Sequence, residues 1–250
     1  MKEIRRFDEE IERLGRRVKD SEDLKVLGDV FDVPTLKALY RLASKDIIKA
    51  MGGVVSTGKE ANVFHALGKE VELAVKIYKI STSDFKAMQE YLIGDPRFKN
   101  IKHSKKDIVI AWAQKELRNL SRAYDAGVRV PKPIVVERNV LVMEFIGKDE
   151  IPAPLLKDVA DEIENPADLL DKVVDYMSVL YNKSKLIHAD LSEYNILYDG
   201  TPVFIDMGQS VTRDHPNAET FLLRDVKNIV RFFRKLGVEC SDEDVIAKIR

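Results

Sequence analysis

The sequence has almost no cysteine, since Cys240 is the only one among 250 residues. A single thiol excludes an internal disulfide and a zinc site built from several cysteines. No apolar run approaches the roughly 20 residues that a membrane-spanning helix needs, so no membrane contact is expected. The first residues, MKEIRRFDEEIERLGRR, are charged and helix-like, which is unlike a secretory signal. Together these features favour a reducing, cytoplasmic setting.

An excess of charge of one sign is also lacking. The chain holds 41 Lys and Arg residues against 42 Asp and Glu residues, for a formal net charge of −1. The molecule as a whole is therefore not a polycation, and any contact with nucleic acid has to come from a local patch. Hydrophobic residues make up 45% and charged residues 33%, which indicates a packed core. The length suits one two-lobed domain, or one domain with a small extension.

Two short motifs carry most of the functional information. Residues His188–Asn195 form the pattern H-x-D-L-x-x-x-N, and Asp206–Gly208 form D-x-G. Between them, two strand-like segments flank an Asp-Gly turn, which predicts a hairpin. A catalytic loop followed by a metal-binding turn, in this order, is typical of kinase-type phosphotransferases. A capped loop and an exposed strand end would be the plain structural explanation, and the pairing of the two motifs weakens it.

Each motif residue has an expected role, because phosphoryl transfer depends mainly on positioning and charge neutralisation. Asp190 is the candidate base that accepts the proton of the incoming hydroxyl group. Asn195 and Asp206 offer an amide oxygen and a carboxylate to the Mg²⁺ that bridges the ATP phosphates. Gly208 lets the chain turn away sharply after the metal-binding aspartate.

A lysine inside an apolar strand is the next candidate. Lys76 lies in A-V-K-I-Y-K, where a kinase lysine would face the nucleotide and pair with its α- and β-phosphates. Its acidic partner is expected on the following long helix, where Glu116 sits near the apolar seam. Glu90, on an earlier helix, is the weaker alternative. An exposed glutamate on a surface helix is the plain explanation for Glu116.

A glycine-rich turn precedes this strand. Residues 52–60 contain G-x-x-x-x-G-K, but the next residue is Glu60 and not Ser or Thr, so the Mg²⁺-binding hydroxyl of a Walker A motif is missing. A strand-like segment follows where a Walker loop would lead into a helix, and we reject a P-loop ATPase. The turn also lacks the kinase pattern G-x-G-x-x-G, and a simple surface hairpin is the alternative to phosphate binding. The residues of this turn expected to meet phosphate are Ser56, Thr57, Gly58 and Lys59.

A hinge is expected after a second hairpin, which turns at Arg138 and Asn139. The segment Met143–Gly147 follows the second strand of this hairpin and precedes the helical part, which is where a kinase hinge lies. Backbone groups of Glu144 and Ile146 would then hydrogen-bond the edge of adenine. This expectation rests on position alone.

The distribution of apolar residues predicts three parts. Residues 1–50 carry two helical stretches with Pro34 between them, and Thr35 is the candidate cap of the second. Residues 51–146 alternate like strands with one or two helices, and residues 147–250 are mostly helical. We predict an α+β, two-lobed protein-kinase-like fold with a helical N-terminal extension, a β-rich N-lobe ending in the hinge, and a truncated helical C-lobe.

Five segments together resemble the RIO family of atypical serine/threonine protein kinases. They are S-T-G-K-E-A-N-V-F-H-A (56–66), A-V-K-I-Y-K (74–79), H-A-D-L-S-E-Y-N-I-L (188–197), I-D-M-G-Q-S (205–210) and H-P-N-A (215–218). The first and third segments look like the first RIO subfamily, whose short helical extension the N-terminal residues would be. The second subfamily would be expected to carry a G-x-G-K-E-S-type loop and a winged-helix domain.

This resemblance implies a Mg²⁺- and ATP-dependent Ser/Thr kinase, with Mn²⁺ as an alternative metal, that acts in maturation of the small ribosomal subunit. The partner would be the pre-ribosomal particle, through protein, with rRNA as a second candidate contact. Members are also described as ATPases that form a phospho-aspartate on the D-x-G aspartate, here Asp206. The family's loop before the glutamate-bearing helix matches residues 94–107, where Ser104 is a candidate self-phosphorylation site. A solvated basic loop with an incidental serine is the alternative.

Two features of ordinary kinases are absent. Ala189 replaces the arginine of H-R-D, which in many kinases receives an activation-loop phosphate, so we expect no switching of that kind. After Asp206 the chain shows no A-P-E motif, and residues 221–236 already have a helical pattern. We therefore expect no ordinary activation segment and no peptide-docking subdomain. A peptide substrate is then poorly accommodated, or the partner particle supplies docking.

Three functions stay open on the sequence. The first is a protein Ser/Thr kinase. The second is an ATPase switch on a pre-ribosomal particle, with incidental autophosphorylation. The third is a small-molecule kinase of the aminoglycoside or choline type, which shares H-x-D-x-x-x-x-N but lacks support from the S-T-G-K-E-A loop. In the second, a basic cluster would contact RNA, although a solvated loop is the other explanation. This cluster consists of Lys99, Lys102, Lys105 and Lys106.

Overall fold

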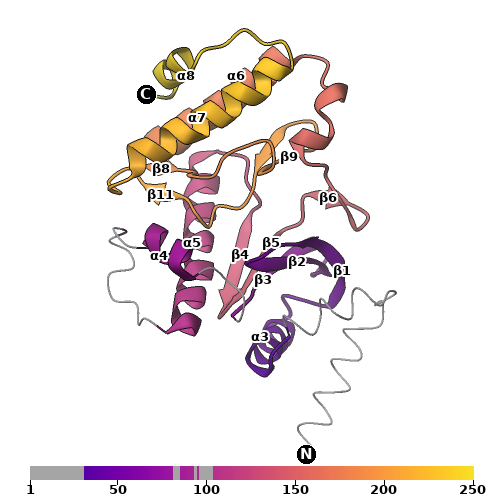
Figure 1. The fold of residues 1–250 in the computed structure, drawn as a ribbon. Helices are drawn as coiled ribbons and strands as arrows, with labels where there is room; N and C mark the ends of the chain where they lie inside the picture. Colours follow the sequence, from indigo (N-terminus) through magenta and orange to yellow (C-terminus); the bar gives the residue numbers. More distant parts are fainter. Residues whose placement is uncertain (1–30, 81–84, 93–94, 96–103) are drawn as a thin grey trace, which may run out of the picture. The chain divides into compact units, whose positions relative to one another are not determined.

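A computed structural model describes residues 31–80, 85–92, 95 and 104–250. These residues form two compact units. Figure 1 labels their helices and strands. The first, called the β unit, contains residues 31–80, 85, 104–113 and 134–152. The second, called the helical unit, contains residues 86–92, 95, 114–133 and 153–250. The helix expected at the start of the chain and most of the basic loop 94–107 lie outside the described residues.

The β unit is built on a five-stranded sheet with the order β1-β2-β3-β5-β4. Its strands are β1 (Ala50–Thr57), β2 (Ala61–Leu67), β3 (Glu72–Tyr78), β4 (Pro133–Glu137) and β5 (Val140–Glu144). The central strand β3 is buried along nearly its whole length and pairs antiparallel with both β2 and β5. Arg138 adopts a φ of 57° in the turn between β4 and β5, where the hairpin was predicted.

Helix α3 (Val33–Ser44) packs its apolar face on this sheet, where Ala38, Leu39 and Leu42 join the core. The prediction that Thr35 caps the helix is wrong. The N-cap is Asp32, whose carboxylate accepts a hydrogen bond from the Thr35 backbone N–H at 2.8 Å. Thr35 lies one turn further on, on the buried face, and its hydroxyl accepts a bond from Asn139 Nδ2 at 2.9 Å.

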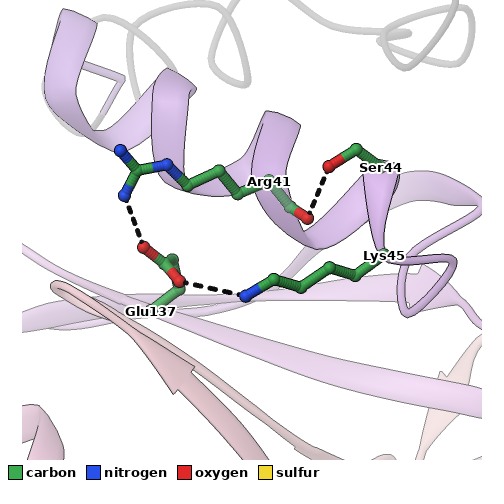
Figure 2. A network of polar contacts seen from close by, with 4 residues as sticks. All are labelled: Arg41, Ser44, Lys45 and Glu137. Carbon is green, nitrogen blue, oxygen red and sulfur yellow. Dashed lines mark hydrogen bonds and ion pairs between the residues drawn. The ribbon is translucent and has the colours of Figure 1, made fainter.

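Polar contacts also join α3 to the edge strand β4 (Figure 2). Arg41 Nη1 lies 2.8 Å from Glu137 Oε1, and Lys45 Nζ lies 3.6 Å from Glu137 Oε2. Ser44 donates its hydroxyl to the Arg41 carbonyl at 2.9 Å, at the last turn of the helix. Such exposed ion pairs contribute little each, so they orient α3 while the apolar face supplies most of the stability.

Two helices and a short hairpin follow or interrupt the sheet. Helix α4 spans Phe85–Leu92, and helix α5 spans Lys105–Ala126 and contributes to both units. Beyond β5, strands β6 (Gly147–Lys148) and β7 (Ile151–Pro152) pair in an exposed hairpin that belongs to the β unit.

The helical unit centres on the helices α6 (Pro166–Asn182), α7 (Ala218–Lys235) and α8 (Asp242–Ile249), of which α6 and α7 run side by side in Figure 1. Two short ladders carry the loops that matter for function. Strand β8 (Leu186–Ile187) pairs with β11 (Val211–Thr212), and β9 (Ile196–Tyr198) pairs with β10 (Pro202–Phe204). Two 3-10 turns, η2 (Leu156–Asp158) and η3 (Ala160–Glu162), precede α6.

The β9–β10 hairpin turns at Gly200, with a φ of 92°, which matches the predicted Asp-Gly turn. Among the described residues, no helix is both long and apolar enough to cross a membrane.

Candidate active site

The loop between β8 and β9 carries the first motif. Asn195 donates its side-chain Nδ2 to the Asp190 carbonyl oxygen at 2.8 Å and to Asp190 Oδ2 at 3.1 Å. These bonds bring two of the predicted site residues into direct contact. Because the amide nitrogen of Asn195 turns toward Asp190, its oxygen is the atom that remains for a cation.

The second motif is joined to this loop through one residue, Ile205. The Ile205 N–H donates to the Asn195 carbonyl at 3.0 Å, and the Ile205 carbonyl lies 3.0 Å from His188 Nε2. Asp206, the next residue, is exposed and adopts a φ of 61°. The structure therefore fixes the backbone that carries Asp206 against both ends of the catalytic loop.

The electrostatics of Asp190 suit a group that accepts a proton. Burial raises the pKa of its carboxyl above the ordinary value, and the neighbouring charge of Asp206 raises it further. The guanidinium of Arg224 and the hydrogen bond from Asn195 oppose that rise. A more basic carboxylate is a better proton acceptor in a transfer reaction.

The donor set fits a magnesium ion held jointly with phosphate groups. Among the described residues, no three His, Cys, Asp or Glu side chains gather into a metal site. Asn195 and Asp206 instead offer hard oxygen donors, and Mg²⁺ commonly takes one or two protein ligands and completes its shell with phosphate and water. The two residues would thus hold the ion only together with a nucleotide.

Two residues of helix α7, Asp225 and Arg224, hydrogen-bond the backbone of the catalytic loop. The sequence did not reveal either of them. Asp225 Oδ2 accepts a hydrogen bond from the Ala189 N–H at 2.8 Å, and its Oδ1 accepts one from the Leu191 N–H at 2.9 Å. Arg224 donates its Nη2 to the Ala189 carbonyl. The peptide groups on both sides of Asp190 are therefore fixed by α7, although Ala189 has a φ of 68° that a residue with a side chain rarely adopts.

Asp225 is an unusual residue for the middle of an apolar helix face. It is 1% exposed, and burial raises its pKa to about 7 against the opposing effect of its two backbone hydrogen bonds. Its position in the sequence, within the apolar stripe of Leu222, Val226 and Ile229, is the signal that could have marked it. A charge in such a stripe needs a buried partner.

Helix α5 holds the D-x-G turn in a similar way. Lys115 Nζ donates to the carbonyls of Gly208 and Ser210, each at 2.6 Å. Asn119 Nδ2 donates to the carbonyls of Met207 and Ser210, each at 2.9 Å. Both side chains are fully buried. The signal in the sequence was a lysine and an asparagine one helical turn apart on an apolar face.

Lys76 occupies the expected strand. It lies on β3 opposite Val63 and Leu141, is 8% exposed, and places Nζ 5.3 Å from the centre of the Tyr78 ring. Glu116 on α5 is fully buried, against the plain explanation of an exposed surface glutamate. Its competitor, Glu90 on α4, is exposed. Because Lys76 and Glu116 belong to different units, their pairing stays a prediction.

The glycine-rich turn lies between β1 and β2, and all four of its candidate residues, 56–59, are exposed. The Gly58 N–H donates to the Ala61 carbonyl at 2.9 Å, and Lys79 Nζ donates to the Gly58 carbonyl at 2.9 Å. The turn is thus ordered by its own backbone and by a lysine from the end of β3. Its contact with phosphate stays a prediction.

The remaining candidates lie at the ends of elements. Glu144 ends β5, where it pairs with Leu73, and Ile146 is buried just beyond it. The Ser104 hydroxyl donates to Asp107 Oδ2 at 2.6 Å and accepts the Asp107 N–H at 3.2 Å, so it caps the start of α5. Their roles as adenine contacts and as a phosphorylation site stay predictions.

Comparison with known proteins gives a consistent result. The sequence model of the RIO domain matches residues 62–246. A RIO-type serine/threonine-protein kinase Rio1 of Haloferax volcanii is 50% identical over 96% of this chain and 83% of its own length. Its counterpart in Methanocaldococcus jannaschii is 44% identical over 96% and 82%. The serine/threonine-protein kinase RIO1 of Caenorhabditis elegans is also 44% identical, but the chain spans only 47% of its length.

Solved structures show the same fold. The Rio2 kinase of Chaetomium thermophilum, in a complex described as ADP/Mg²⁺-phosphoaspartate, superposes with a TM-score of 0.66 at 24% identity, over 86% of this chain and 66% of that one. A second structure of this Rio2 kinase gives 0.65, also at 24% identity. The predicted kinase-like α+β fold is therefore confirmed.

Proposed function

This chain belongs to the RIO family of atypical serine/threonine protein kinases, in its first subfamily, and is an enzyme with kinase activity; we propose that it transfers the γ-phosphate of ATP to a hydroxyl group at the site formed by Asp190, Asn195 and Asp206. The observation that carries this proposal is the hydrogen-bonded path from Asp190 through Asn195 and Ile205 to Asp206. It joins a candidate base to two oxygen donors within one unit.

Each residue of this site has its own role in the proposed phosphate transfer. Asp190 accepts the proton of the attacking hydroxyl while that oxygen forms its bond to the γ-phosphorus, the bond from the γ-phosphorus to the bridging oxygen breaks, and ADP leaves. Asn195 and Asp206 would hold Mg²⁺, which would neutralise charge on the phosphates. Asp225 and Arg224 keep the backbone around Asp190 in place, and Lys115 and Asn119 keep the turn after Asp206 in place.

A second activity is favoured by the position of Asp206. Its carboxylate is exposed on a backbone with a φ of 61°, so it is accessible to more than a metal ion. A phosphoaspartate is described for the Rio2 kinase of Chaetomium thermophilum. We extend that chemistry to Asp206, where a carboxylate oxygen attacks the γ-phosphorus, the bond to the bridging oxygen breaks, and ADP leaves. Hydrolysis of the acyl phosphate by water would then complete an ATPase cycle.

The biological setting follows from the family resemblance. We propose that the chain acts in the cytoplasm on the maturing small ribosomal subunit, with ATP turnover as a switch on that particle. Lys105 and Lys106 are exposed at the start of α5, where they are accessible to a phosphate backbone. A small-molecule kinase is the less favoured function, because the relatives above are named protein kinases.

Incubation with Mg²⁺ and γ-labelled ATP, followed by hydroxylamine, tests the chemistry. Hydroxylamine cleaves acyl phosphates and leaves phosphoserine intact, so the label on Asp206 is expected to be lost and the label on serine kept. Asp190→Ala is expected to abolish transfer to protein substrates, and Asp206→Ala to remove the hydroxylamine-sensitive label as well. Label that resists hydroxylamine and maps only to Ser or Thr would exclude the phosphoaspartate.

The kinase assignment has its own control. Lys76→Ala removes the buried cation expected to meet the α- and β-phosphates, and transfer should fall by orders of magnitude. Full activity of that variant would contradict the proposed nucleotide site.

A further inference from the structure

Glu72, at the start of β3, holds both ends of the segment that follows β5. Its backbone carbonyl accepts the Phe145 N–H at 3.4 Å. Its side-chain Oε1 accepts the Glu150 N–H at 2.8 Å. The segment between these two bonds contains Ile146 and leads into the β6–β7 hairpin. One residue of the sheet therefore defines the conformation of the segment from Phe145 to Glu150.

A buried histidine steadies the same carboxylate. His65 Nε2 lies 3.0 Å from Glu72 Oε1, and the imidazole is 2% exposed. Its ring also packs edge-to-face on Phe145, with centres 4.9 Å apart and an interplanar angle of 80°. On the other side, a Cβ at Gly52 would come within 2.6 Å of Nδ1, so only glycine leaves room for the ring. His65 thus links Glu72 to the first residue after β5.

The β6–β7 hairpin gains little from apolar burial, so its polar contacts matter for its conformation. All four residues of β6 and β7 are exposed, and Ile151 is 70% exposed. Asp149 and Glu150 adopt φ values of 54° and 66°, and Gly147 has a φ of 153° with no space for a Cβ beside the Ile151 carbonyl. Such backbone conformations persist only where surrounding contacts fix them. Apolar burial cannot do so here, so polar contacts have to, and the bond from the Glu150 N–H to Glu72 is one of them beside the pairing of β6 with β7.

We propose that Glu72, held by His65, is a positioning residue that fixes the hinge backbone at Glu144 and Ile146 and thereby sets nucleotide affinity and base selectivity. This inference rests on the proposed function, since it takes those backbone groups as the ones that meet the base. Adenine and guanine present opposite donor and acceptor patterns at the edge concerned. When the backbone groups of Glu144 and Ile146 are held in fixed positions, they pair with adenine and leave guanine's polar groups unpaired, so guanine is rejected. When these backbone groups can move, the preference for adenine over guanine becomes weaker.

The test uses two substitutions with opposite predictions. Glu72→Gln keeps the Oε1 atom that contacts the Glu150 N–H and His65 Nε2. Glu72→Met keeps the length of the side chain and removes this acceptor. Glu72→Met should raise KM for ATP about tenfold, the equivalent of one lost hydrogen bond, and reduce the preference for ATP over GTP. The value of kcat at saturating ATP should change less than about twofold, because the reacting groups lie elsewhere.

The controls separate positioning from stability. Glu72→Gln should stay within about twofold of wild type in both KM and selectivity. Glu70→Met makes the same change at an exposed residue just before β3, and its KM and base selectivity should also stay within about twofold of wild type. A folded Glu72→Met variant with wild-type KM and base preference overturns the proposal, as does a Glu72→Gln variant that behaves like Glu72→Met.

A replacement variant and a binding measurement cover the cases in which Glu72→Met does not fold or the protein does not transfer phosphate. If Glu72→Met does not fold, His65→Phe takes its place, because it keeps a ring on Phe145 and loses the bond to Glu72. That variant should shift KM and selectivity in the same direction, and unchanged values overturn the proposal. Calorimetric binding of ATP and GTP is measured in parallel. If the wild type binds ATP selectively without transferring phosphate, the proposed function fails while the role of Glu72 is still decided.

Discussion

Lys115 is a buried ammonium group whose hydrogen bonds go to backbone carbonyls, those of Gly208 and Ser210. The Ser210 carbonyl also accepts from Asn119, whereas the Gly208 carbonyl accepts its bond from Lys115. Removing the lysine would take this donor away from a buried carbonyl. The turn that carries Asp206 therefore depends on Lys115 together with Asn119.

We predict that Lys115→Met destabilises the protein by about 1–3 kcal/mol, the usual effect of leaving a buried acceptor unpaired. The Mg²⁺ concentration that gives half-maximal activity should rise with it, since the turn presents Asp206. Denaturant unfolding and a Mg²⁺ titration of phosphate transfer measure the two effects. Lys227→Met, at an exposed position of α7, should change neither. An unchanged Mg²⁺ requirement in a destabilised Lys115→Met variant would limit the lysine to a structural role.

At this scale the sequence predicted the motif residues that the structure brings together and missed the residues that hold their backbone in place. Asp190 and Asn195 stand at fixed spacing in a motif, and the structure brings them into contact. Lys115 and Asp225 follow no such spacing, because their partners are peptide groups far along the chain. An apolar stripe shows that a polar residue is buried, but only the tertiary structure shows which peptide it meets.

Helix α4 reaches the catalytic loop indirectly, through Arg224 of α7. Tyr91 on α4 stacks on Phe221 of α7, with ring centres 5.2 Å apart and an interplanar angle of 22°. Its hydroxyl lies 3.4 Å from Arg224 Nη2, and the same nitrogen donates to the Ala189 carbonyl. Arg224 therefore brings a guanidinium to the residue where ordinary kinases have the arginine of H-R-D.

We predict that Arg224→Gln lowers kcat about tenfold or more while KM for ATP stays nearly unchanged, because the loop that carries Asp190 loses a charged hydrogen bond. Tyr91→Phe keeps the stacked ring and should lower kcat by a smaller factor in the same direction. Steady-state kinetics of both variants provides the measurement. Arg231→Gln, on an exposed part of α7, serves as the matched control. A fall in ATP affinity without a fall in kcat would contradict this role.

Elements were predicted well where local sequence decides them. The hairpin turn at Gly200 follows from a residue that accepts positive φ. The turn at Arg138 and Asn139 follows from its place between two strand-like runs, although Arg138 adopts a φ of 57° that its side chain disfavours. The cap of α3 was missed because Asp32 and Thr35 both suit an N-cap by residue type. The bond from Asn139 to Thr35, which settles the choice, comes from the β4–β5 turn, 104 residues away, and is invisible to local patterns.

At the scale of the whole molecule, Asp225 makes stability depend on pH. Its pKa is about 7 in the folded protein against an ordinary value of 3.8. Between these values the folded protein keeps a proton that the unfolded chain has released. Raising the pH through this window therefore lowers the free energy of unfolding, and the loss is complete above pH 7.

We predict that the stability of the wild type relative to Asp225→Asn is greatest near pH 4 and falls by up to about 4 kcal/mol as the pH rises to 7. The asparagine does not titrate, and every other group is common to both proteins. Its amide nitrogen faces a backbone N–H, so the variant should also lose one of the two loop bonds. Urea unfolding at a series of pH values measures the gap. A gap that stays constant or widens toward pH 7 would contradict the assignment.

The fold class could be predicted as a whole, because strands and helices segregate along the chain. The division into units could not, since residues 105–113 and 114–126 of one helix, α5, fall into different units. Helical periodicity is continuous across that point, and only tertiary packing distinguishes its two halves.

The hydrogen bonds from α5 to the turn after Asp206 have a consequence for the design of ligands. A ligand that displaced this turn and filled the space it leaves would have to break four hydrogen bonds from Lys115 and Asn119, two of them made by a buried charge. Compounds that compete with ATP and leave the turn in place avoid that loss, and they are the chemical class from which ligands for this protein should come.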